Sequence, residues 1–97
     1  MTRTDALRTV ERLQPWAQAL DDVNHAINEA HLLGQRPAET LWNRKAHLDI
    51  IVRELGRIVL IDRELAADET PDSAKPRLEE QRRELDEIAK KHTEALR

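Results

Sequence analysis

The sequence predicts an all-α fold, a bundle of three helices, and two observations support this. Apolar residues recur at spacings of three and four in three separate stretches, which places each set on one face of an α-helix. No run of alternating apolar and polar residues is long enough to suggest a β-strand. Each apolar stripe must be buried, so we expect the helices to pack stripe against stripe. The three sets are Leu13, Trp16, Leu20, Val23, Ile27 and Ala30; Leu41, Leu48, Ile51, Leu55, Ile58 and Leu65; and Leu78, Leu85, Ile88 and Ala95.

The first helix is predicted over about residues 3–33, with a kink or break near residues 14–15. Pro15 lacks a backbone N–H and disfavours helical angles at Gln14. Gly34 is suited to the left-handed conformation that ends many helices. The first helix is therefore expected to end just before Gly34.

The second helix is predicted over residues 37–67. Pro37 suits the first position of a helix, because its missing N–H would have no partner there. The short link after Gly34 joins two segments of equal length, which favours an antiparallel helical hairpin. Gly56 lies inside the second helix, and we expect it to permit close packing of a neighbouring helix.

The third helix is predicted over residues 76–96, after a main loop at 68–75 that is rich in turn-forming residues. Pro76 can open this helix. Its apolar stripe is thin, and pairs such as Glu79–Arg83 on its exposed side contribute only ~0.2–0.5 kcal/mol each. The third helix must therefore dock on the hairpin, and residues 1–97 form a single helical domain.

The composition excludes several classes of function. The chain has no cysteine, so it holds no disulfide, thiolate metal site or cysteine nucleophile. Charged residues make up 36% of the chain without a basic segment, and only two residues are aromatic, which disfavours a nucleic-acid partner. No apolar run approaches the ~20 residues of a membrane span, and the first residues lack the apolar core of a signal peptide. We expect a cytoplasmic protein without membrane contact, and the excess of arginine over lysine suggests a GC-rich bacterial genome.

The middle of the second helix is apolar over more of its circumference than one stripe requires. Residues 58–61 are four consecutive apolar residues, ended by Asp62, and they cover almost the whole circumference of a helix. Two neighbouring helices would leave part of this surface exposed, and a contiguous apolar patch indicates an interaction site. We therefore predict a two-fold homodimer. The predicted interface residues are Trp42, Ile50, Val52, Val59, Leu60 and Ile61.

Histidines and carboxylates provide few candidates for chemistry. Asp21, His25 and Glu29 share one helix face, a ligand set that suits zinc or iron, but a solvated face is the preferred interpretation. His47 belongs to the second helix. His92 lies on the stripe of the third and is interpreted as a core-edge residue, with a pH-sensitive interface as a minor alternative. The sequence predicts no catalytic residue, no metal and no cofactor.

The preferred functional hypothesis is a non-enzymatic helical module for protein–protein interaction or assembly, acting as a scaffold, adaptor or regulator through the second helix. One alternative is a small all-α enzyme with its active site in the bundle or at the dimer interface, lined by Arg44, Gln81, His92 and Asp62. Another is an antitoxin-like or phage-type inhibitor that masks a target protein. The partner protein is not identified by the sequence.

Overall fold

The computed structural model describes residues 3–97 and contains three α-helices and one short 3-10 helix. These are α1 (Arg3–Leu32), α2 (Glu39–Ala66), η1 (Asp72–Ala74) and α3 (Lys75–Ala95). No strand occurs within residues 3–97. The predicted all-α bundle of three helices is therefore confirmed. Within the same residues, none of the helices combines the length and apolar character needed to cross a membrane.

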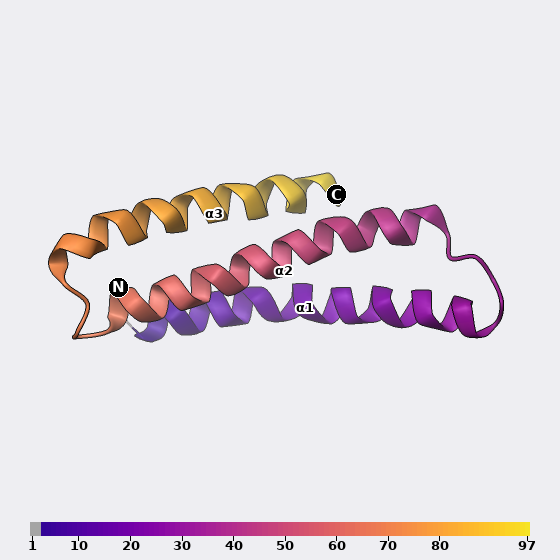
Figure 1. Ribbon diagram of the computed structural model, residues 1–97, viewed down its shortest axis with the longest axis horizontal. Coiled ribbons are helices and arrows are strands. Elements are labelled where there is room, and N and C mark those ends of the chain that lie inside the picture. The colour runs from indigo at the N-terminus through magenta and orange to yellow at the C-terminus, as the bar shows by residue number, and fades with distance from the viewer. Residues whose placement is uncertain (1–2) are drawn as a thin grey trace.

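The central helix of the bundle is α2. Both α1 and α3 pack against it, while the backbones of α1 and α3 stay apart (Figure 1). The bundle is elongated, with extents of 55 × 20 × 17 Å. Figure 1 shows that α3 ends partway along α2, so the end of the α1–α2 hairpin projects beyond the C-terminus. Residues near this projecting tip are covered by two helices only.

The first helix runs through Pro15 as one element, so the predicted break into two segments does not occur. The reason lies in the position of Pro15 on the helix. Pro15 and Glu11, whose carbonyl would accept the missing hydrogen bond, are both exposed, and water can hydrate that carbonyl. A bend of α1 at Pro15 stays a prediction.

The helix α1 ends just before Gly34, as the sequence predicts. Gly34 has a φ of 68°, which an L side chain rarely adopts. The N–H of Gln35 donates to the carbonyl of Ala30 at 2.8 Å, and the N–H of Gly34 donates to that of His31 at 3.0 Å. These two bonds form the Schellman motif, which satisfies the last carbonyls of the helix.

The second and third helices begin close to their predicted prolines. α2 starts at Glu39 instead of Pro37, because Ala38 keeps an extended ψ of 141° and acts as the N-cap. Pro37 is buried in the link between the helices. α3 starts at Lys75, with Pro76 in its first turn as expected. The hydroxyl of Thr70 donates to the carbonyl of Glu64 at 2.6 Å, which ties the loop to the end of α2.

The hydrophobic core follows α2 in two connected clusters. One cluster consists of Val23 and Ile27 of α1 with Leu48 of α2. The other contains residues of α2 and α3, namely Ile51, Leu55, Ile58 and Ala89. Trp16 and Leu96 pack against both clusters and so connect them. The apolar stripe of the second helix is therefore the seam of the bundle, and each buried Leu or Ile contributes roughly 1.5–3 kcal/mol of transfer free energy.

Gly56 has a different environment from the one expected. A Cβ atom added at Gly56 would meet no atom within 4 Å, so no neighbouring helix approaches closely there. The expectation of close packing was wrong. Sequence spacing placed Gly56 inside a helix, but the direction from which α1 and α3 approach leaves this position in open space.

Candidate functional site

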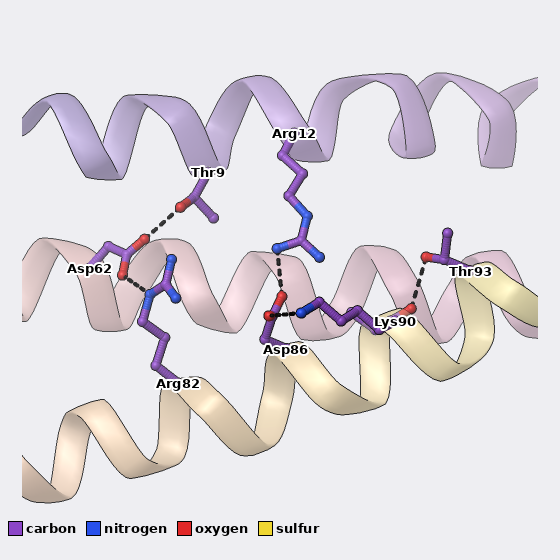
Figure 2. A network of polar contacts seen from close by, with 8 residues as sticks. Thr9, Arg12, Asp62, Arg82, Asp86, Lys90 and Thr93 are labelled. Atoms are coloured by element: carbon purple, nitrogen blue, oxygen red, sulfur yellow. Dashed lines mark hydrogen bonds and ion pairs between the residues drawn. The ribbon is translucent and has the colours of Figure 1, made fainter.

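A fully buried carboxylate joins all three helices (Figure 2). Asp62 of α2 has no exposed surface. Its Oδ2 accepts a hydrogen bond from the hydroxyl of Thr9 on α1 at 2.5 Å, and its Oδ1 accepts one from Nε of Arg82 on α3 at 2.7 Å. A charge this deep is tolerated only when it is paired and hydrogen-bonded. These two contacts therefore hold Asp62 in one orientation.

The position of Asp62 in the core had a signal in the sequence, whereas its partners had none. Asp62 follows Leu55 by seven residues and Ile58 by four, so it shares their stripe. Nothing in the sequence marks Thr9 or Arg82 as a partner of a buried carboxylate, because threonine and arginine both occur at many other positions. Only the packing of α1 and α3 on α2 brings them to Asp62.

A second polar contact connects α1 to α3 directly. Nη1 of Arg12 lies 2.6 Å from Oδ1 of Asp86, and Nζ of Lys90 lies 3.4 Å from Oδ2 of the same residue. Figure 2 shows Arg12 reaching from α1 to Asp86 on α3. Partial burial raises the pKa of Asp86, but hydrogen bonds and positive charge from Arg12 and Lys90 outweigh this effect, and the net pKa is lowered. Arg12 therefore bridges helices whose backbones do not touch.

A second buried carboxylate, Glu54, is paired within its own helix. Its side chain is 2% exposed, and its two oxygens lie 2.7 Å from Nε of Arg53 and 3.8 Å from Nη1 of Arg57. Both arginines are mostly exposed. On α2, Glu54 lies on the same side as Ile50 and Ile61, four residues before it and seven after it. Glu54 thus lies on the side of α2 that carries the half-buried Ile50 and Ile61.

This side of the molecule contains a groove between α2 and α3, which we call the outer groove. It has a volume of about 380 Å³ and is lined by Arg57, Leu60, Ile61, Gln81, Glu84 and Leu85. On α3, Ile88 follows the groove residue Glu84 by four positions and therefore lies on the same side of the helix. Leu60 is 58% exposed and Ile88 is 40% exposed. The outer groove therefore combines open apolar surface with a basic residue on its α2 wall and an acidic residue on its α3 wall.

The six predicted interface residues are divided among three places. Leu60 and Ile61 line the outer groove, and the helix spacing puts Ile50 on the same side of α2, seven residues before the groove residue Arg57. Val52 and Val59 share a line of α2 with Ala66, which borders residues 6, 7 and 10 of α1, so these two valines face α1. Val59 is buried there, at 7% exposure.

Trp42, the sixth predicted residue, lies at the projecting tip of the hairpin. Its ring centroid is 6.2 Å from that of His31 on α1. Leu60 lies 18 residues further along α2, or about 27 Å at the rise of an α-helix. Trp42 and Leu60 therefore belong to separate surfaces, and both are exposed.

The four residues of the predicted enzyme site do not surround one pocket. Arg44 and Gln81 are exposed, whereas Asp62 is fully buried. Arg44 and Asp62 are 18 residues apart on α2, again about 27 Å. Among the described residues, no hydrogen bond or ion pair joins His92 to the other three, and its ring pairs instead with His47, with 2.9 Å between the two Nδ1 atoms.

The three residues that the sequence analysis considered as metal ligands lie on the solvent-exposed side of α1. Asp21, His25 and Glu29 are all exposed. Within the part of the chain that the structure describes, no group of three or more histidines and carboxylates is arranged to hold a metal ion. No protein-family model, curated protein or solved structure matches this chain.

Proposed function

We propose that the protein is a non-enzymatic helical interaction module that forms a homodimer through the outer groove. The observation that carries this proposal is a groove lined by the exposed Leu60 and the half-buried Ile61, with the exposed Ile88 one turn along α3 from the groove residue Glu84. Apolar surface removed from water contributes roughly 25 cal/mol per Å². Association through this groove would bury side chains that the three helices leave open.

The charges of the groove support a second copy as the occupant. Arg57 lies on the α2 wall and Glu84 on the α3 wall. If a two-fold axis runs parallel to the helices, α2 of one chain faces α3 of the other at the same height. Arg57 then meets Glu84 of the second copy, and the reciprocal pair forms by symmetry. Glu64 of α2 and Arg77 of α3 border a neighbouring depression between the same elements and are also oppositely charged, with the signs exchanged between the helices, so the same two-fold axis would pair them as well.

Glu54 favours this arrangement because it orders the arginine side of the groove. Nη1 of Arg57 lies 3.8 Å from Oε2 of Glu54, which is buried beneath it. A side chain that is partly held before association loses less conformational entropy on binding. Arg57 is thereby prepared to meet an acidic partner without leaving Glu54 unpaired, since Arg53 also contacts Glu54 at 2.7 Å.

The tip of the hairpin supports a scaffold or adaptor role for such a dimer. Leu32 and Leu33 are 88% and 67% exposed, and Trp42 is exposed near the same turn. This surface lies about 27 Å along α2 from Leu60, so self-association through the outer groove leaves it free. Exposed Trp and Leu side chains at one site are typical of a surface that contacts another protein.

The proposal is tested by the oligomeric state of the chain in solution. We expect sedimentation equilibrium to show a dimer for the wild type and a monomer for Leu60→Asp, with the helical content unchanged by circular dichroism. Leu32→Asp, which places the same charge on the exposed tip, is the matched control and should stay dimeric. A wild type that is monomeric at millimolar concentration, or a Leu60→Asp variant that stays dimeric, would overturn the proposal.

A further inference from the structure

The side chains of His47 and His92 meet where the end of α3 docks on α2. Their Nδ1 atoms are 2.9 Å apart, and their ring planes are tilted by 46°. We propose that this pair is a binding site for a divalent transition-metal ion that prefers imidazole nitrogen, of the Cu²⁺ or Ni²⁺ type, and that the ion joins α2 to α3. This inference is independent of self-association through the outer groove.

The spacing of the two nitrogens fits adjacent positions around one ion. A bond from imidazole nitrogen to a first-row metal is about 2.0–2.1 Å long. Two such bonds at a right angle place their nitrogens about 2.9 Å apart, so the hydrogen-bonded separation of the two Nδ1 atoms would need to change little when an ion replaces the hydrogen between them. A tetrahedral angle would require about 3.3 Å, and the rings would have to separate. Cu²⁺ and Ni²⁺, which adopt square-planar or octahedral coordination, therefore require less separation of the two rings than tetrahedral zinc does.

The surroundings of the pair leave room for the other ligands. Both histidines are half-buried, so water can reach the open side of the site and complete the coordination. Among the described residues, neither ring makes an ion pair or a second hydrogen bond. Ala89 lies one turn from His92 on α3, and Ile51 lies one turn from His47 on α2. Because Ala89 and Ile51 belong to one core cluster, the histidine pair borders the apolar core.

The hydrogen that joins the two rings must move before an ion can bind between them. In the metal-free pair, one Nδ1 carries the hydrogen that the other Nδ1 accepts. To bind an ion, both rings must present bare Nδ1 atoms, so the shared hydrogen moves to Nε2 of its own ring. Each imidazole then carries its hydrogen on Nε2 and presents the lone pair of Nδ1 to the ion.

Binding of an ion would strengthen the docking of α3. This helix has one fully buried residue, Ala89, and its last turn is held by Leu96 against the two core clusters. An ion that binds the folded chain in preference to the unfolded chain stabilises the fold in proportion to ligand concentration. His47 and His92 are 45 positions apart, so the complete site exists only when α3 is docked.

The test uses the full chain without an affinity tag, stripped with a chelator and titrated with Ni²⁺ and with Cu²⁺. Calorimetry should show one ion bound per chain, with a raised midpoint of thermal unfolding. His47→Ala and His92→Gln should each weaken binding at least about tenfold, because loss of a first ligand costs no less than loss of a supporting residue. The glutamine keeps a hydrogen-bonding group at the pair if removal of the side chain disturbs α3.

Two exposed histidines of the same chain provide matched controls. His25→Ala and His31→Ala should leave the affinity unchanged. Electron paramagnetic resonance of the Cu²⁺ complex should show coupling to two imidazole nitrogens in the wild type and to one in His47→Ala. Binding that survives in both His47→Ala and His92→Gln, or that falls equally in His25→Ala, would overturn the proposal. Absence of binding at millimolar ion would do the same.

Discussion

The hydroxyl of Thr9 donates a hydrogen bond of 2.5 Å to Oδ2 of Asp62, although the two residues are 53 positions apart. Both lie in the core of the bundle, with Thr9 5% exposed and Asp62 not exposed at all. A shift of α1 by one turn along α2 would take the Thr9 hydroxyl away from Oδ2 of Asp62 and leave this buried carboxylate oxygen without its hydrogen-bond donor. Because an unpaired buried polar group costs about 1–3 kcal/mol, the contact selects one register of α1 against α2.

The first prediction concerns this carboxylate. Asp62→Ala should lower the free energy of unfolding by on the order of 3 kcal/mol, because it removes the buried carboxylate that accepts from the Thr9 hydroxyl and pairs with Arg82. Urea unfolding followed by circular dichroism measures the change. Asp72→Ala is the control, since the Asp72 side chain is 96% exposed, and its effect should stay within about 0.5 kcal/mol. Equal effects of the two substitutions would contradict the role given to Asp62.

The two glycines are expected to respond in opposite directions to alanine. Gly34→Ala should destabilise the protein by about 1 kcal/mol, because a side chain at a φ of 68° is strained. Gly56→Ala should stabilise it by up to about 1 kcal/mol, because the new methyl group meets no atom within 4 Å and the helix gains propensity. Thermal unfolding of both variants, each at the same chain concentration, checks the prediction. A destabilised Gly56→Ala variant would indicate a neighbour at this position.

The lowered pKa of Asp86 predicts that the protein loses part of its folding stability in acid. Its pKa is lowered from the ordinary value of 3.8, partial burial being outweighed by Arg12 and Lys90. A group whose pKa is lowered in the folded state stabilises the fold above its unfolded-state pKa. That contribution is lost as the pH falls from about 5 toward the lower folded-state value.

The corresponding experiment measures unfolding free energy against pH. Asp86→Asn should be less stable than the wild type at neutral pH, and the difference should shrink as the pH falls through this window. Asp68→Asn, in the exposed loop before α3, should follow the wild type throughout. A constant difference between Asp86→Asn and wild type at every pH would show that the ion pairs of Asp86 do not contribute.

The proposed dimer predicts reciprocal rescue between Arg57 and Glu84. Arg57→Glu and Glu84→Arg should each weaken dimerisation, by about 1 kcal/mol or roughly fivefold in Kd, because each places like charges together. Combining both substitutions in one chain should restore the wild-type Kd. Arg63→Glu, on the part of α2 that borders α1, is the control and should not affect association. A double variant weaker than either single variant would rule out the two-fold arrangement, while leaving open dimerisation by another geometry.

Local features of the chain were sufficient to predict the helices and their ends. Spacings of three and four identified the buried seam at Leu48, Ile51, Leu55 and Ile58, which are all at most 1% exposed. Gly34 marked the end of α1 because few other residues accept a positive φ. These predictions succeed because helix periodicity and backbone conformation depend on residues a few positions apart.

The identity of the buried polar pairs and the extent of the exposed surface depended on the tertiary structure. Asp62 is bound by side chains 53 positions before it and 20 positions after it, and His47 meets His92 from 45 positions away. Val59 and Leu60 are neighbours of similar character, yet one is buried beside α1 and the other is 58% exposed. The sequence by itself determined which segments are helical and which stripe is buried. Only the directions from which α1 and α3 approach α2 decided which charges are paired and which apolar residues stay open, because these directions arise from the packing of all three helices together.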